Sequence, residues 1–364
     1  MSAPIIAEIS LSALGDNLRH LASTIAPTRL MVVVKANAYG HGSLAAAQEA
    51  VRQGMTDLAA LDLDTALILR RGGIPQSVRV LSWLYPPGTD FREAVRHGVD
   101  LGVSRLSEVA GIVSAVRAVR VEDGSGVVAH LHLKLDTGLR RNGATEAEWP
   151  ALVAAVVEAQ REGVVRAVAA WTHIAEASDD EDTVALRRFE HGIAQAAEWG
   201  LPGLERHLAA SSAGLRRSDV RLDMVRMGGH CWGIPSFDGV TPEDIGLRPV
   251  MTLRSVVVGT RHDHPQWGGV GYVSAGYGDG VPRAVAGQVS VAIDGQLTPV
   301  LDVHRDYLIV ADPAARLRTG SEAVLFGTGR QGEQTVRQWG DATGTLGDEI
   351  TARISARVSR VYVN

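Results

Sequence analysis

The chain has 364 residues, of which 45% are hydrophobic and 21% charged, and its formal net charge is −5 at pH 7. This length suggests about two domains, and the composition is that of an ordinary globular protein. The acidic balance argues against nucleic acid as a partner, and no apolar run is long enough to span a membrane. With no signal-like start and a single cysteine, Cys231, the sequence predicts a cytoplasmic protein.

From residue 29 to about residue 233, short apolar runs alternate with segments of helical period. The predicted strands are 30–35, 57–61, 78–83, 100–104, 127–136, 165–174, 205–211 and 223–228. Helical segments between them include 43–53, 106–119, 146–162 and 182–199. Strands that alternate with helices form parallel sheets, and eight such units predict a closed (β/α)8 TIM barrel. The alternative is an open, doubly wound sheet.

Beyond residue 237 the sequence changes to β-branched runs separated by Gly, Asp and Pro, as in "MTLRSVVVGT" and "ARISARVSRVYV". This pattern predicts a β-rich domain with few helices. We therefore expect three parts. Residues 1–10 form a strand that joins the C-terminal domain, residues 11–237 form the barrel, and residues 238–364 form the β-rich domain.

The first barrel strand ends in "VVVKANAYGHG", in which an apolar run stops at Lys35. A lysine can change its pKa when it is desolvated and then condense with a carbonyl group. The alternative is a strand that simply ends at solvent, where lysine is common.

Polar residues also follow the later strands of the barrel. In chain order they are Lys134, Asp136, Arg141, His173, Ser211, Ser212 and Arg226. Each has an ordinary structural explanation: a core histidine, a surface ion pair or a helix N-cap. However, the carboxyl ends of barrel strands meet on one face, which is where barrels carry their chemistry. The joint placement therefore favours a functional site.

This set suits an aldehyde cofactor that carries a phosphate. A lysine can hold the aldehyde, here Lys35. Ser212 at a helix N-terminus, with Gly228 and Gly229 after the eighth strand, can bind phosphate through backbone N–H groups. Barrels often bind phosphate after strands seven and eight. The sequence therefore predicts pyridoxal 5'-phosphate held by Lys35 and no metal site.

Nearly the whole chain resembles the alanine racemase family, the pyridoxal phosphate enzymes of fold type III. The matching segments are "VVKANAYGHG", "KLDTGLRRNG", "WTHI", "DMVRMG" followed by "WGIPS", "GYGDGVPR" and "RVSRVY". The resemblance implies an enzyme that interconverts L- and D-amino acids by moving the Cα proton. It also implies a head-to-tail homodimer whose β-rich domain contributes to the partner's active site, with Lys35 as one of two catalytic bases.

The resemblance further implies roles around the cofactor. Tyr39 and Ser212 would support the phosphate, and His173 would pack on the ring. Arg226 would face the pyridine nitrogen. Because an arginine keeps its proton, that nitrogen would stay unprotonated and the ring would be a weaker electron sink. Such a ring suits brief deprotonation at Cα and disfavours transamination.

Two more residues of the "KLDTGLRRNG" segment have implied roles. Arg141 would face the cofactor phenolate and the substrate carboxylate. Lys134 matches a lysine that many relatives carbamylate in order to position that arginine.

The second base is where the resemblance is weakest. In the family, a tyrosine of the partner subunit lies in a "VxYG" loop well before the "GYxDG" block, but residues 256–280 are too short to hold both. One interpretation makes "GGVGY" this motif and Tyr272 the catalytic base. The other makes it the strand that leads into Tyr277, with the tyrosine loop lost. The remaining titratable candidates are His262, His264 and His304.

Two further segments depart from the family. Its "CMD" is "HRD" here, so Arg305 stands in place of a methionine. Arg305 and Tyr277 are the substrate-binding candidates of the β-rich domain. The hypothesis is that Arg305 favours a larger or more acidic amino acid than alanine; the alternative is that it pairs with Asp306 or Asp302. The family's "YE" is replaced by Asp348 and Glu349, and a carboxylate would repel a phosphate.

Because the β-rich domain departs from the family, a lyase or decarboxylase on the same fold is the alternative function. A third possibility is a cofactor-binding protein with little turnover. The presence of Lys134, Arg141 and Arg226 argues against it, since storage needs no partner for a substrate carboxylate.

Overall fold

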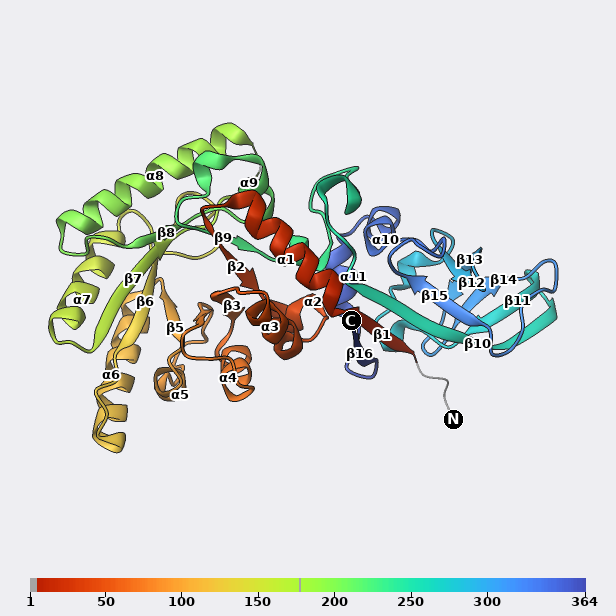
Figure 1. The fold of residues 1–364 in the computed structure, drawn as a ribbon, viewed down its shortest axis with the longest axis horizontal. Helices are drawn as coiled ribbons and strands as arrows, with labels where there is room; N and C mark the ends of the chain where they lie inside the picture. Colours follow the sequence, from red (N-terminus) through yellow and green to blue (C-terminus); the bar gives the residue numbers. More distant parts are fainter. Residues whose placement is uncertain (1–4, 177) are drawn as a thin grey trace. The chain divides into compact units, whose positions relative to one another are not determined.

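The structure is a computed structural model that describes residues 5–176 and 178–364. It consists of two compact units (Figure 1). The barrel unit contains residues 21–35 and 43–228, and the β-rich unit contains the described part of residues 1–20 together with residues 36–42 and 229–364.

Eight parallel strands close the barrel of the first unit. They are β2 (Arg29–Val33), β3 (Asp57–Leu61), β4 (Arg79–Ser82), β5 (Asp100–Val103), β6 (Ala129–Lys134), β7 (Val165–Trp171), β8 (Glu205–His207) and β9 (Met224–Met227). Most residues of these strands are buried, because helices cover the outer face and side chains fill the interior. All eight predicted strands are present, and the barrel is confirmed.

Helices alternate with these strands. They are α3 (Ser43–Arg52), α4 (Leu63–Arg71), α5 (Arg92–Arg96), α6 (Leu106–Asp123), α7 (Trp149–Arg161), α8 (Asp179–Glu198) and α9 (Ser211–Arg216), with a short 3-10 helix at Ser218–Val220. Their starts follow local chemistry: the side chain of Asp62 accepts a hydrogen bond from Thr65 N at 2.7 Å and caps α4. Among the described residues, no helix is both long and apolar enough to cross a membrane.

The second unit contains an eight-stranded sheet in the order β11-β14-β13-β12-β15-β10-β1-β16. The strands are β1 (Ile6–Ser10), β10 (Met251–His264), β11 (Gly268–Val273), β12 (Ser290–Ile293), β13 (Gln296–Val303), β14 (Leu308–Ala311), β15 (Glu322–Phe326) and β16 (Ser359–Val363). β1 pairs with β10 and β16, so the first strand of the chain lies in the C-terminal sheet. β10 also pairs with β11. The six antiparallel strands β10, β11, β14, β13, β12 and β15 therefore form a closed ring of pairings.

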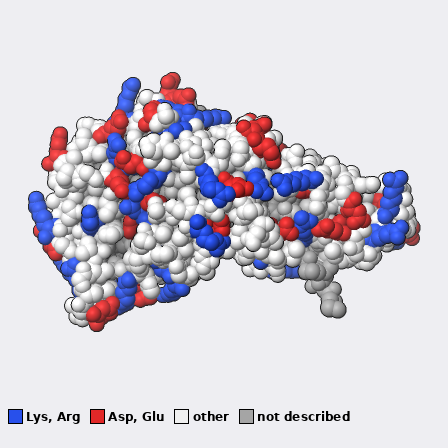
Figure 2. All heavy atoms as spheres, in the orientation of Figure 1, with Lys and Arg blue, Asp and Glu red and all other residues white. Residues whose placement is uncertain are grey.

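Few helices accompany this sheet. They are α1 (Leu11–Ile25), α2 (Lys35–Tyr39), α10 (Val336–Thr343) and α11 (Gly347–Arg353). The last turn of α1 and the first residue of α2 belong to the barrel unit. Short 3-10 helices lie at Gly229–Trp232, Glu243–Ile245, Tyr277–Asp279 and Arg283–Val285. On the described surface that faces the viewer in Figure 2, acidic and basic side chains are interspersed. Such a mixed surface does not form the single-sign field that attracts a polyanion.

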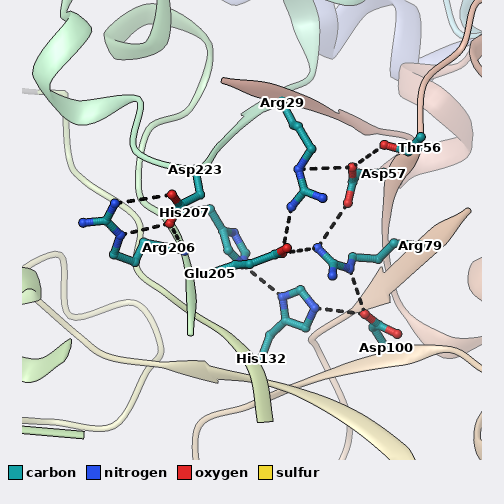
Figure 3. Close-up of polar contacts among 10 residues, drawn as sticks. All are labelled: Arg29, Thr56, Asp57, Arg79, Asp100, His132, Glu205, Arg206, His207 and Asp223. Atoms are coloured by element: carbon teal, nitrogen blue, oxygen red, sulfur yellow. Dashed lines mark hydrogen bonds and ion pairs between the residues drawn. The ribbon is translucent and has the colours of Figure 1, made fainter. Parts of the chain in front are cut away.

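The N-terminal end of the barrel holds a cluster of charged side chains that we call the basal charge cluster. Its members are the first residues of five strands: Arg29, Asp57, Arg79, Asp100 and Glu205. Arg79 donates to Glu205 at 2.6 Å, to Asp100 at 3.0 Å and to Asp57 at 3.2 Å (Figure 3). Because parallel strands start at the same end of a barrel, alternate charges meet there and neutralise one another.

Candidate active site

Four of the predicted site residues lie at the opposite, carboxyl-terminal end of the barrel strands. Lys35 follows β2, Lys134 ends β6, His173 follows β7 and Arg226 is the third residue of β9. This end is the mouth of the barrel, where the βα loops meet.

Arg226 is held in a fixed orientation. It is 6% exposed. One guanidinium nitrogen, Nη2, donates to the carbonyls of Thr172 and Leu208 at 2.9 and 3.1 Å and to His173 Nδ1 at 3.1 Å. The other, Nη1, donates to His207 Nδ1 at 3.2 Å. Each of these four acceptors is neutral, so the positive charge of Arg226 is oriented without being cancelled.

Trp171 is an aromatic neighbour of two of the cations. The Lys134 ammonium lies 4.1 Å from the centre of its ring, and the Arg226 guanidinium carbon lies 5.0 Å away, both within range of a cation–π contact. The Lys134 ammonium also donates to Asn142 Oδ1. Trp171 is buried, and its Nε1 has no hydrogen-bond partner within the described part of the chain.

The mouth concentrates positive charge. Burial, Arg226 and Arg141 together lower the pKa of Lys134 to about 7. Burial and Arg141 lower the pKa of Arg226 to about 9. The pKa of His173 is lowered to about 2, which keeps this ring neutral. Burial is the largest cause, followed by the positive charges of Arg226, Arg141, Lys134 and Lys35. Cations that destabilise one another in this way favour an anionic ligand.

The loop after β6 presents Arg141. Asp136 Oδ1 accepts from the backbone N of Gly138 at 2.9 Å and of Arg140 at 3.1 Å, which shapes this loop. A groove of about 700 Å³ opens beside it, lined by Asp136, Gly138, Arg140, Arg141, Asn142, Gly143, Thr145, Glu146 and Arg188.

The predicted phosphate side lies around α9. Ser211 begins this helix, Ser212 is its second residue, and Gly228 directly follows β9. The backbone N of Gly228 donates to Ser211 Oγ at 3.2 Å, and the backbone N of Ala213 donates to Glu176 Oε1 at 2.9 Å. A carboxylate therefore accepts from the backbone N–H of Ala213, the residue that follows Ser212 of the predicted phosphate site.

The segment after Lys35 has an unusual backbone. Ala36, Asn37, Ala38 and Tyr39 all have φ between 51° and 54°, so four residues with side chains form a left-handed turn. Each such residue costs about 1–2 kcal/mol relative to the right-handed form. Strain of this kind persists only where the surroundings impose it, which is common at functional sites.

Close packing in the β-rich unit imposes this conformation. A Cβ on Gly40 would lie 2.0 Å from the carbonyl oxygen of Thr351, so only glycine fits there. His41 stacks on Trp232 with ring centroids 5.1 Å apart, and its Nδ1 lies 2.9 Å from Ala38 O.

Tyr39 and Asp348 interact electrostatically in this unit. Burial raises the pKa of Tyr39 well above its usual value, and the charge of Asp348 raises it further. The negative charge of Asp348 therefore acts on the Tyr39 hydroxyl. This hydroxyl stays protonated and can donate a hydrogen bond.

Tyr272 lies within a strand. In β11 it pairs with Gly259 of β10 on one side and with Ile309 of β14 on the other. Its ring meets that of Tyr307 edge to face, with centroids 5.6 Å apart. This register matches the interpretation of "GGVGY" as the strand that leads into Tyr277.

The other candidates for a base lie nearby in the same unit. His304 stacks on Tyr307 at 4.6 Å, and its Nε2 lies 3.3 Å from Asp302 Oδ2. His262 and His264 belong to the last residues of β10, and His264 stacks on Trp267.

Arg305 has a partner within its own unit. Its side chain is 73% exposed and pairs with Asp306 at 3.2 Å, and Asp306 also lies 3.4 Å from Arg357. This ion pair corresponds to the alternative explanation of Arg305. Tyr277 is 49% exposed.

Sequence reasoning did not single out Trp171, His132 or His207. All three are buried inside barrel strands. The available signal was a polar or aromatic side chain at an inward position of an otherwise apolar strand, as in "AHLHLK". Such a side chain must find a partner when it is buried.

A closed (β/α)8 barrel with lysines and a buried arginine at its mouth, in a chain that also has a β-rich unit, is typical of enzymes whose chemistry lies at the carboxyl ends of the barrel strands. Family models specify it further. The model described as alanine racemase, N-terminal domain, matches residues 9–235, and that for the C-terminal domain matches residues 245–362. The chain belongs to the alanine racemase family.

Individual relatives agree. The alanine racemase of Streptomyces coelicolor is 39% identical, covering 98% of this chain and 95% of that protein. The alanine racemase of Thermobifida fusca is 36% identical, covering 100% of this chain and 99% of that one. The crystal structure of alanine racemase from the D-cycloserine producer Streptomyces lavendulae has a TM-score of 0.92 at 35% identity, covering 100% of this chain and 98% of that chain.

Proposed function

We propose that the protein is a pyridoxal-phosphate-dependent amino-acid racemase of the alanine racemase type. The observation that carries this proposal is the buried group of mutually destabilised cations at the barrel mouth, with Arg226 oriented by four neutral acceptors. The relatives named above are all alanine racemases, and they give no support to the lyase or decarboxylase alternative.

The residues present fit this cofactor. Its phosphate and phenolate are anionic, and they match the excess of positive charge at Lys134, Arg141 and Arg226, which the carboxylates of Asp136 and Glu176 offset only in part. The N–H of Trp171 is a buried donor without a partner among the described residues. When bound, pyridoxal phosphate supplies an aldehyde that condenses with amino groups and a ring that accepts electron density. Lys35 would hold the aldehyde, and Tyr39, Ser212 and Gly228 would support the phosphate.

The side chains of the mouth define what happens at Cα. Arg226 would face the pyridine nitrogen and, because it keeps its proton, would leave that nitrogen unprotonated. His173 would pack on the ring as a neutral imidazole. Arg141 would bind the substrate carboxylate, and Lys134, if it is carbamylated as the resemblance implies, would position that arginine. With the pyridine nitrogen unprotonated, the ring would take up less negative charge from Cα, which favours prompt return of the proton to Cα.

Racemisation needs a group on each face of Cα. Lys35 would move the proton on one face. We keep Tyr272 as the proposed second base, with His262, His264 and His304 as alternatives. A histidine titrates near neutral pH, whereas a tyrosine must have its pKa lowered well below about 10.

The proposed assembly is a head-to-tail homodimer in which each barrel mouth is completed by the partner's β-rich unit. What supports it is the division of the site: Lys35 and Arg226 lie in one unit, whereas Tyr277 and Arg305 lie in the other. We expect Lys35→Ala and Tyr272→Phe chains, each inactive alone, to regain activity when mixed, and a fully active monomer in sedimentation would contradict the dimer. The one cysteine, Cys231, is consistent with action in the cytoplasm.

The central test is deuterium exchange at Cα combined with chiral analysis. With L-alanine in heavy water, we expect D-alanine and deuterium at Cα in both enantiomers. The variants Tyr272→Phe, His262→Ala, His264→Ala and His304→Ala should identify the second base, because its loss stops exchange from one enantiomer only. If the unaltered protein exchanges a single enantiomer with full retention, the racemase proposal is wrong.

A further inference from the structure

A line of three hydrogen bonds crosses the inside of the barrel behind Arg226. Arg226 Nη1 lies 3.2 Å from His207 Nδ1, His207 Nε2 lies 3.0 Å from His132 Nδ1, and His132 Nε2 lies 3.1 Å from Asp100 Oδ2. Figure 3 shows the two rings and the carboxylate. Both imidazoles are completely buried. The line therefore joins the mouth of the barrel to the basal charge cluster.

The order of donors and acceptors in this line follows from its two ends, Arg226, which can only donate, and the Asp100 carboxylate, which can only accept. A guanidinium has no acceptor, so His207 Nδ1 must carry no proton and Nε2 must carry one. His207 then donates to His132 Nδ1, which must also be unprotonated. His132 carries its proton on Nε2 and donates to the Asp100 carboxylate. Both rings are thus neutral Nε2–H tautomers, and every bond points from Arg226 toward Asp100.

We propose that Asp100 and His132 are positioning residues for Arg226, acting through His207. The carboxylate fixes the tautomer of His132, which fixes that of His207, which in turn keeps an acceptor facing Arg226 Nη1. An opposite tautomer would place an N–H against the guanidinium. The tautomer chain stands on geometry alone; its effect on the cofactor rests on the proposed function.

The far end of the line is well anchored. Asp100 Oδ2 also accepts from Arg79 Nε at 3.0 Å, and Asp100 Oδ1 lies 3.3 Å from His130 Nδ1. Although burial raises the pKa of Asp100, the hydrogen bonds from His130 and His132 and the charge of Arg79 hold it well below its usual value. Asp100 is therefore ionised and accepts hydrogen bonds only.

The near end is held by stacking and burial. The His207 ring lies nearly parallel to Trp171, at 6° and 5.5 Å, so its plane is fixed. Burial lowers the pKa values of both His132 and His207, and Arg226 lowers that of His207 further. Two neutral rings between a cation and an anion can orient one another through their hydrogen bonds without carrying charge themselves.

The first experiment needs no variant. Nitrogen-15 NMR of the full-length protein with labelled histidine reports which ring nitrogen is protonated. We expect His132 and His207 to be Nε2–H tautomers from about pH 6 to about pH 9. A proton on Nδ1 of either ring, or a doubly protonated ring, overturns the tautomer chain whether or not the protein is a racemase.

The second experiment tests positioning. Asp100→Leu removes the acceptor, whereas Asp100→Asn keeps an oxygen for His132. With Asp100→Leu we expect a tautomer mixture at His132, a shifted absorption maximum of the bound cofactor and a kcat at least about tenfold lower, the effect of one hydrogen bond to a charged group. Asp100→Asn should stay within about threefold of the unaltered protein.

Arg29→Gln is the matched control, because it weakens the basal charge cluster without touching the line. It should lower the melting temperature but leave the tautomers and the cofactor spectrum unchanged. If Asp100→Leu also leaves them unchanged, or if Arg29→Gln shifts them equally, positioning is wrong. If Asp100→Leu does not fold, His132→Phe replaces it, with a shifted cofactor spectrum expected and an unchanged one contradicting the proposal.

Discussion

The barrel mouth and the β-rich unit differ in how firmly they hold their candidate side chains. At the mouth, Arg226 is 6% exposed and donates to four acceptors. In the β-rich unit, Arg305 is 73% exposed and has an acidic neighbour as its partner. A buried, oriented group is ready to act, whereas an exposed group gains a precise role only when something covers it. The proposed cofactor side of the site is thus preorganised, and the proposed substrate side depends on the proposed partner.

The largest effect should come from Lys35. Lys35→Ala should abolish racemisation and the visible absorbance of the bound cofactor, because it removes the amine proposed to condense with the aldehyde. Borohydride reduction of the unaltered protein, followed by peptide mapping, should label Lys35. Lys134→Gln is the control and should keep the label. A label on another lysine would contradict the proposal that Lys35 holds the aldehyde.

Arg226→Lys tests whether orientation matters in addition to charge. A lysine is a point charge that cannot reach acceptors on both sides of a guanidinium. We expect kcat to fall about 100-fold, which corresponds to about 3 kcal/mol, the upper value for hydrogen bonds to a charged group. Steady-state kinetics with circular dichroism as a folding control would measure it. A kcat within about threefold of the unaltered value would show that charge alone suffices.

These two predictions depend on residues whose positions the sequence indicated. Apolar runs predicted the eight barrel strands, and the topology of a barrel then placed Lys35 and Arg226 at one end. The line from His207 to Asp100 could not be predicted, because it depends on which side chains of staggered strands share a layer. The left-handed turn at residues 36–39 was equally hidden, since alanine and tyrosine disfavour that backbone and only tertiary packing imposes it.

The β-rich unit was less predictable for a related reason. For Tyr272, local sequence allowed both a loop and a strand, and the pairing with Gly259 and Ile309, which are distant in sequence, decides where it lies. For Arg305, an adjacent aspartate suggested the ion pair, but sequence cannot say whether substrate displaces it.

Lys134 should produce a dependence of stability on pH. Burial, Arg226 and Arg141 lower its pKa from 10.5 to about 7 in the folded protein. Between these values the unfolded chain binds the proton and the folded protein does not, so the free energy of unfolding should rise with pH. Below a pH of about 7 both states carry the proton, and the folded protein then bears the full free-energy cost of burying the Lys134 charge. Urea titrations of cofactor-free protein should show this rise, and Lys134→Met should lack it.

Glu176 should affect cofactor affinity modestly. Its carboxylate accepts from Ala213 N, next to Ser212 of the predicted phosphate site, so it would repel a phosphate there. Glu176→Gln keeps an acceptor without the charge, and we expect cofactor to bind about fivefold more tightly, as for the loss of about 1 kcal/mol of repulsion. Fluorescence titration would measure the change. Glu181→Gln, in the first turn of α8, is the control; weaker binding by Glu176→Gln would show that this carboxylate supports the site.

The smallest effects should come from Arg305, because an exposed ion pair contributes only about 0.2–1 kcal/mol. If the guanidinium meets the substrate, Arg305→Met should lower activity on aspartate and glutamate relative to alanine, by at most about fivefold. Asp306→Asn should shift the ranking the other way, because it frees Arg305 from the partner 3.2 Å away. Opposite shifts would show that substrate and Asp306 compete for one cation. An unchanged ranking in both variants would mean that Arg305 only pairs with Asp306 and does not select the substrate.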